Sequence, residues 1–317
     1  MNSYFLERGF IQIWHMLKVR PSSDVAPALD SMAMSANPIS SLDPQAPISE
    51  FDWPGHSGPL RLRLYRALEG KPSLMVFFAP GGFVAPDLDE ANNCLRVLAN
   101  GCGVNILAPY YAESPDRAFP APVEDAHVVL SMAAQHRARL ASRSARLFVG
   151  GCEAGGNLAA VSALVCRDRL GPDLAGQVLI MPMLDASMGC GSMRCASGDP
   201  QQRELAQAAE AAYRHYLRNP ADRLHPYASP LNARRLGDLP PALIFHTQGD
   251  PLADEAKAYA AQLREAGNVA HDVALPPADN LSDVADRCEL TADDPCVLAT
   301  SEFIARPTEA PVAGQRA

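Results

Sequence analysis

Apolar residues recur along this chain in short runs, separated by longer segments with a helical repeat. Residues 60–65 alternate apolar and polar positions, a pattern that predicts a strand with one solvated face. Continuous apolar runs are typical of strands buried on both faces, and they occur at 74–78, 104–108, 145–149, 178–181 and 242–246. Helices are predicted between them, at 88–100, 123–137, 157–170, 252–266 and 296–305. This alternation predicts an α/β fold with a mostly parallel central sheet and helices on both faces.

The flanks of this alternating region have a different character. Residues 1–50 begin with an amphipathic segment, which is followed by a stretch rich in Pro, Ser, Ala and Met. We expect these residues to form an N-terminal cap arm. Residues 51–306 would form the core. A long insertion with a predicted helix at 201–217 separates two of the expected strands, so a helical cap is predicted at about 186–226. We expect the tail, 307–317, to be disordered.

Amino-acid composition limits the kinds of molecule that this chain is expected to bind. The 317 residues are 48% hydrophobic, enough for a substantial core, and the net charge is −9 with scattered basic residues. Nucleic-acid binding is therefore not expected. No apolar run approaches the roughly 18 residues that cross a bilayer, and charges interrupt the opening segment where a signal peptide would be apolar. We therefore expect a cytoplasmic protein that has no membrane partner. We expect its eight cysteines to be reduced, and we expect no bound metal.

A sharp turn is predicted at Gly151-Cys152-Glu153-Ala154-Gly155, between the apolar run 145–149 and the helix 157–170. Strand, glycine-flanked turn and helix make up the context of a nucleophile elbow, which presents one side chain to a pocket. Small flanking residues allow the chain to turn tightly. In this chain the presented side chain is the carboxylate of Glu153.

Several further blocks resemble the bacterial hormone-sensitive-lipase family of α/β-hydrolase-fold carboxylesterases, over roughly residues 45–306. The block FAPGGF at 78–83 is similar to the family's HGGGF oxyanion loop. Other blocks follow in the family's order: APYYAE at 108–113, FPAPVEDA at 119–126, the elbow, YASPL at 227–231, LPPAL at 239–243 and DPLADE at 250–255. The resemblance implies an α/β-hydrolase fold with a helical cap.

The resemblance also assigns site residues one by one. In such esterases a serine attacks the carbonyl, a histidine moves the proton, an acid orients the histidine and backbone amides hold the oxyanion. Glu153 stands at the serine position and Asp250 at the acid position. Asn280 stands at the histidine position, with Asp279 open as the alternative after a one-residue shift. The amides that could hold an oxyanion are those of Gly81, Gly82 and Ala154.

These assignments predict that serine-esterase chemistry is lost. We expect a non-hydrolytic enzyme of the isomerase, lyase (dehydratase) or cyclase type, acting on a small, apolar, carbonyl-containing molecule with Glu153 as general acid and base. Proximity to Asp250 would raise the pKa of Glu153, whereas Asp254 and Glu255 would serve only the helix dipole. The alternatives are a pseudoenzyme that binds a small molecule or a partner, and a residual carboxylesterase. No cofactor is expected, and a homodimer stays open.

Overall fold

The computed structural model describes residues 38–312, apart from positions 44, 57, 70, 71, 112 and 277–289. Most of the predicted N-terminal arm therefore lies outside the described residues. The same holds for the predicted site positions Asn280 and Asp279, and for the tail beyond residue 312.

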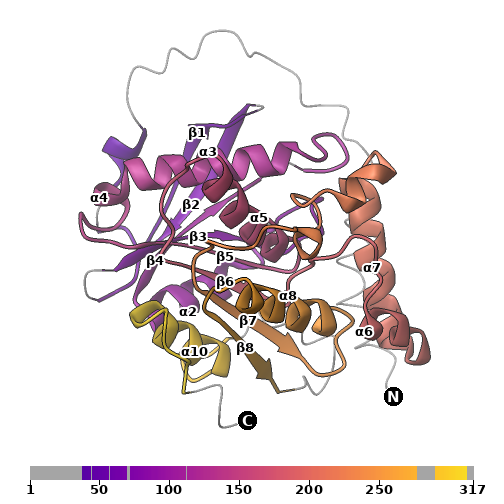
Figure 1. Ribbon diagram of the computed structural model, residues 1–317. Helices are drawn as coiled ribbons and strands as arrows, with labels where there is room; N and C mark the ends of the chain where they lie inside the picture. The colour runs from indigo at the N-terminus through magenta and orange to yellow at the C-terminus, as the bar shows by residue number, and fades with distance from the viewer. Residues whose placement is uncertain are drawn as a thin grey trace, which may run out of the picture.

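The described residues form one sheet of eight strands in the order β1-β2-β4-β3-β5-β6-β7-β8 (Figure 1). Strand β2 is antiparallel to both β1 and β4, and all the other neighbours are parallel. From β3 the chain continues to β4 on one side of the sheet, whereas from β5 it continues to β6 on the other side. The loops after β3 and β5 therefore meet at a topological switch point, where α/β sheets bind ligands. The strands are β1 Ile48–Pro54, β2 Pro59–Tyr65, β3 Ser73–Phe78, β4 Val104–Pro109, β5 Leu147–Cys152, β6 Gly176–Ile180, β7 Ala242–Thr247 and β8 Ala270–Leu275.

Helices cover both faces of this sheet, as predicted. One face packs against α3 (Ala121–Gln135), α5 (Ala154–Asp168) and α8 (Ala253–Glu265), and the other packs against α2 (Asn92–Cys102) and α10 (Pro295–Ala305). Alternate residues of one strand enter the two cores: Val76 belongs to the first and Phe77 to the second. Burial on both faces is the reason the central strands are continuous apolar runs.

Shorter elements complete the fold. The insertion after β6 forms α6 (Gly191–Cys195), η2 (Ala196–Gly198), α7 (Pro200–Tyr216) and η3 (Pro220–Leu224) at one side of the molecule (Figure 1). Asp199 caps α7 by accepting from the amides of Gln201 and Gln202, and Pro200 occupies the first helical turn. The remaining elements are η1 Pro38–Ser41, α4 Arg137–Leu140 and η4 Pro230–Asn232.

Two predictions at the first strands are corrected. Residues 48–50, assigned to the cap arm, begin β1, an edge strand in which only Phe51 is buried, so its apolar pattern was too weak to indicate a strand. The solvated face predicted for β2 is also wrong at Arg63, which is 8% exposed. Its guanidinium donates to Glu50 at 2.5 Å, to the carbonyl of Leu88 at 2.9 Å and to Asp89 at 2.6 Å. These acceptors compensate the buried charge.

Loss of the Arg63 guanidinium is expected to destabilise the fold. Arg63→Met would leave the carbonyl of Leu88 and the hydroxyl of Tyr110 without this donor, because both accept from Arg63. A cost of about 2 kcal/mol in the free energy of unfolding is expected, measured by urea denaturation. Arg61→Met on the same strand removes only an exposed 3.6 Å pair with Asp52 and should cost under about 0.5 kcal/mol. Equal losses in the two variants would contradict this account.

Candidate functional site

Glu153 stands at the tip of the turn between β5 and α5, as the sequence predicts. Its φ of 52° and ψ of −114° lie in a region that side chains other than glycine rarely adopt. Backbone hydrogen bonds hold it there. Its amide donates to the carbonyl of Ile180 at 3.0 Å, and its own carbonyl accepts from the amides of Asn157 at 3.0 Å and Met183 at 3.1 Å. The elbow is therefore a strained residue held by its neighbours.

The glycines around the elbow are required by close backbone contacts. A Cβ atom on Gly151 would lie 2.1 Å from the carbonyl oxygen of Gly155. A Cβ atom on Gly155 would lie 2.0 Å from the carbonyl oxygen of Phe78, at the end of β3. Both separations are far below van der Waals contact, so only glycine fits. The start of α5 thus packs directly against the strand that leads into the loop at 79–83.

This loop curls through three successive residues with positive φ, namely Gly81 at 148°, Gly82 at 58° and Phe83 at 61°. The amides of Val84 and Ala85 close the turn by donating to the carbonyl of Gly81. Buried Tyr111 stabilises the loop, because its hydroxyl donates a hydrogen bond to the carbonyl of Ala79 at 3.0 Å. The predicted oxyanion donors therefore belong to two segments in direct contact, with Gly81 and Gly82 on the loop and Ala154 on the elbow.

Electrostatics make Glu153 a stronger base than an ordinary carboxylate. The residue keeps some exposure, but the surrounding protein removes most water from the carboxyl group, and this burial is the main cause that raises its pKa to about 7. The negative charge of Asp250 raises it further, in the direction predicted from the sequence, and Glu90 adds a smaller contribution. The sequence carried no signal for Glu90, which comes near the site only through the fold.

Asp250 is 6% exposed and lies in the turn between β7 and α8. Its Oδ1 accepts from the amide of Leu252 at 2.8 Å, which orders the turn that carries it. Because β7 is separated from β5 only by β6, Asp250 lies near enough to Glu153 for its negative charge to raise the pKa of that carboxyl group. The structure therefore brings these two predicted site residues together.

The role predicted for Glu255 is wrong. A residue that served only the helix dipole would be solvated, whereas Glu255 is 1% exposed. Its Oε2 accepts from the amides of Leu184 and Asp185, both at 2.6 Å. Burial raises its pKa to about 8, against the opposing effect of these two amides. The sequence placed Glu255 in the first turn of a helix but contained no information on what the side chain faces.

The cap insertion contacts the loop at 79–83 through aromatic rings. Phe83 stacks on Tyr216 of α7 with ring centres 3.9 Å apart and planes 3° from parallel, and Tyr213 packs beside it. Phe119 meets Tyr216 edge-on, and its amide donates to the carbonyl of Tyr216 at 3.0 Å. Helix α7 is thus held against the segment that supplies two of the three predicted oxyanion donors.

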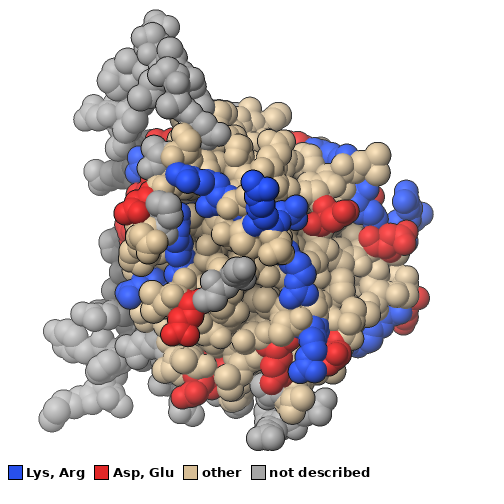
Figure 2. Space-filling view, turned by 90° about the vertical axis from the view of Figure 1, so that its left-hand side faces the viewer, with Lys and Arg blue, Asp and Glu red and all other residues tan. Residues whose placement is uncertain are grey.

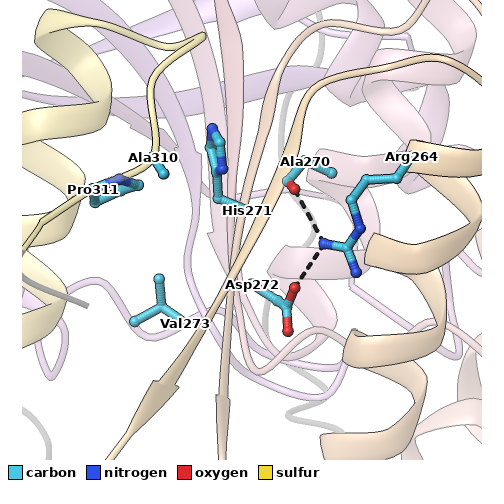
Figure 3. A pocket seen from close by; sticks show the side chains of 7 residues that line it. All are labelled: Arg264, Ala270, His271, Asp272, Val273, Ala310 and Pro311. Carbon is cyan, nitrogen blue, oxygen red and sulfur yellow. Dashed lines mark hydrogen bonds and ion pairs between the residues drawn. The ribbon is translucent and has the colours of Figure 1, made fainter. Parts of the chain in front are cut away.

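The two histidines in the last strands lie elsewhere. His246 of β7 pairs with Asp272 of β8, with Nε2 and Oδ2 3.7 Å apart, and burial lowers its pKa. His271 lines a surface pocket on β8 (Figure 3), in which Arg264 donates to Asp272 at 2.7 Å and to the carbonyl of Ala270 at 3.1 Å. Strands β6 and β7 separate this pocket from the elbow.

Among the described residues, no three His, Cys, Asp or Glu side chains are grouped as metal ligands would be. No helix within the described ranges has the length and apolar character needed to cross a bilayer.

Known proteins that are similar to this chain include ester hydrolases. A model of the alpha/beta hydrolase fold matches residues 75–276. The carboxylic ester hydrolase LipN of Mycobacterium tuberculosis is 33% identical over 232 residues, and the match spans 69% of this chain and 60% of LipN. The ethyl acetate hydrolase of Pseudomonas putida is 35% identical over 231 residues, with 70% of each protein covered. A hyperthermophilic esterase from the archaeon Pyrobaculum calidifontis has a TM-score of 0.71 and 32% identity, over 82% of this chain and 85% of that one.

These similarities confirm the predicted α/β-hydrolase fold and overturn the predicted function. The prediction of an isomerase, lyase or cyclase that has lost ester hydrolysis is contradicted, because the similar proteins are ester hydrolases. The pseudoenzyme alternative is contradicted with it. The error was to equate the residue type at the elbow with the reaction. A carboxylate whose pKa is about 7 can activate water, so a carboxylate at the elbow does not exclude hydrolysis.

Proposed function

This chain belongs to the α/β hydrolase fold family, and from that premise we propose that it hydrolyses small carboxylic esters with the Glu153 carboxylate as general base. In this proposal Glu153 takes the place at which esterases of this kind carry serine, and water takes the place of the serine hydroxyl. One observation carries the proposal: a carboxylate with a pKa of about 7 stands at the elbow tip, and the start of α5 beside it packs against Phe78 and Ala79, which lead into the loop of Gly81 and Gly82.

The reaction balances with these groups alone. The oxygen of water attacks the ester carbonyl carbon while Glu153 accepts one of its protons. The amides of Gly81, Gly82 and Ala154 would then hold the negative charge that forms on the carbonyl oxygen. The carbon–oxygen bond to the alcohol breaks, and the leaving alkoxide takes the proton from Glu153. A carboxylic acid and an alcohol result, and Glu153 is again a carboxylate.

The other site residues would support this base. The charge of Asp250 raises the pKa of Glu153 and so increases its proton affinity at neutral pH. We propose that Asn280, or Asp279 as the alternative, corresponds in the sequence to the histidine of such esterases and helps to position Glu153 or the substrate. Support for these two positions comes from the order of the sequence blocks alone.

The pH dependence of hydrolysis tests the proposal. The purified chain is expected to hydrolyse p-nitrophenyl acetate above the rate of a heat-denatured sample. Because the ionised form of Glu153 is the base, kcat/KM should rise with pH and level off above an apparent pKa of about 7. Turnover no faster than the blank at every pH would contradict the proposal. A kcat/KM that falls as the pH rises through 7 would contradict the role of Glu153 as base.

The same proposal extends to partners. We propose a small-molecule substrate and no nucleic-acid partner, which is supported by the net charge of −9. Figure 2 supports this as well, since Lys and Arg side chains occur together with Asp and Glu side chains on the face it presents. The expectations of a cytoplasmic location, of no membrane partner and of no metal or cofactor, together with the homodimer left open, stay predictions. The same applies to the cap arm before residue 48 and to the boundaries of the cap and the tail.

A further inference from the structure

The segment that follows β6 contacts both the elbow and helix α8. Residues 183–186, here called the strap, run beside the elbow. The amide of Met183 donates to the carbonyl of Glu153 at 3.1 Å, and the carbonyl of Met183 accepts from Asn157 Nδ2 at 2.8 Å. The carbonyl of Leu184 accepts from the amide of Leu231 at 3.1 Å. The strap is therefore a backbone partner of the residue that bears the proposed base.

The next two amides of the strap, those of Leu184 and Asp185, both donate to Oε2 of Glu255 at 2.6 Å. Glu255 reaches them from the first turn of α8 and is 1% exposed. Burial of a carboxylate is unfavourable unless it is hydrogen-bonded, and two short bonds from backbone amides supply that compensation. The side chain thus connects α8 to the strap.

This connection links the two carboxylates of the site. Asp250 lies in the turn that leads into α8, where it accepts from the amide of Leu252. On the other side, the strap binds the carbonyl of Glu153, whose φ of 52° is maintained only by its surroundings. If the strap moved away from α8, Glu153 would lose one backbone partner and the distance between the elbow and Asp250 would change.

We propose that Glu255 is a positioning residue for ester hydrolysis: by binding the amides of Leu184 and Asp185, it holds the strap against Glu153 and keeps the elbow tip facing Asp250. Glu255 does not contact the reacting atoms in this proposal. The inference rests on the proposed function, because it concerns the same site.

Two variants distinguish the length of the side chain from its ability to ionise. Glu255→Gln keeps the length of the side chain and a carbonyl oxygen that accepts both amides, but it cannot ionise. Glu255→Asp keeps a carboxyl group but is one methylene shorter, so its oxygen cannot reach both amides. We expect Glu255→Gln to retain the kcat of the wild type. Glu255→Asp should lower kcat by about 10-fold or more with little change in KM, because the base is displaced. Glu265→Gln, an exposed substitution at the end of α8, is the control.

A second readout does not depend on turnover. Titration of the Glu153 carboxyl carbon by ¹³C NMR is expected to give a pKa near 7 in the wild type, in Glu255→Gln and in the control. In Glu255→Asp the pKa should fall, because a displaced elbow admits water to the carboxylate. A role that is only structural would lower the melting temperature but leave kcat per folded molecule and this pKa unchanged.

The outcomes are distinct. Wild-type kcat and Glu153 pKa in Glu255→Asp would overturn the inference. A loss of kcat of about 10-fold or more in Glu255→Gln would overturn it as well, whether or not the Asp variant folds. If the wild type does not hydrolyse esters, the proposed function fails, and the NMR titration still decides whether Glu255 positions Glu153.

Discussion

Glu153→Gln is expected to lower kcat/KM for a p-nitrophenyl ester by about 100-fold or more, within the range that general base catalysis contributes. Glutamine has nearly the same shape and fills the same place at the elbow tip, but its amide cannot accept a proton from water at neutral pH. The rise of kcat/KM with an apparent pKa near 7 should disappear together with the activity. Steady-state kinetics between about pH 5 and 9 measure both effects.

The same substitution is expected to stabilise the folded chain at high pH, so that lost activity is not mistaken for lost structure. In the folded state the pKa of Glu153 is raised from 4.5 to about 7. Between these two values the unfolded chain has released the proton and the folded chain retains it, so the free energy of unfolding falls as the pH rises. Above pH 7 the cost is complete, on the order of 2 kcal/mol after allowance for the partial exposure of the residue.

Glutamine avoids this cost because it carries no charge at any pH. Glu153→Gln should therefore exceed the wild type in stability at about pH 8 and match it at about pH 4, as measured by urea denaturation. The exposed substitution Glu265→Gln serves as the control and should change neither rate nor stability. If Glu153→Gln hydrolysed the ester as fast as the wild type, the proposed role of Glu153 would be wrong.

Gly155→Ala is expected to have the largest effect on folding. The added Cβ would lie 2.0 Å from the carbonyl oxygen of Phe78 and 2.7 Å from that of Ala79. Neither oxygen can rotate away as a side chain would, because both belong to the backbone at the end of β3. Helix α5 must therefore shift away from the sheet, at a cost of about 3 kcal/mol in the free energy of unfolding.

Activity should fall with stability in Gly155→Ala, because the shift separates the amide of Ala154 from those of Gly81 and Gly82. Thermal unfolding and the p-nitrophenyl assay on the remaining folded protein measure the two losses. Gly198→Ala is the matched control, since a Cβ there meets nothing within 4 Å, and it should stay within about 0.5 kcal/mol of the wild type. Similar unfolding free energies for the two glycine variants would contradict the close contact.

The central strands and the elbow were predictable because their signals are local. The run predicted at 145–149 and the helix predicted at 157–170 correspond to β5 (Leu147–Cys152) and α5 (Ala154–Asp168), and the turn between them is where the glycines indicated. Burial on both faces produces a continuous apolar run, and a sharp turn requires small residues. By contrast, β1 has a single buried residue, Phe51, and its pattern predicted no strand.

Residue type alone misled the functional prediction. Glu153 was correctly placed at the elbow, but a carboxylate at this position was interpreted as evidence that the protein had lost ester hydrolysis. Its reactivity depends on its pKa, and the pKa depends on burial and on the neighbouring charges of Asp250 and Glu90. Those three positions lie far apart along the chain, so no local pattern reports on their distance.

The sequence by itself determined the order of the central strands and of the helices that cover them, the sharp turn that carries Glu153 and the loop of Gly81 and Gly82, because each depends on residues adjacent along the chain. Only the tertiary structure decided that Arg63 is buried among its acceptors, that the charge of Glu90 adds to the raised pKa of Glu153, and that Glu255 binds the amides of Leu184 and Asp185. Burial and electrostatic interaction depend on distances in space, and in this fold the sheet brings together residues that are about a hundred positions apart in the sequence.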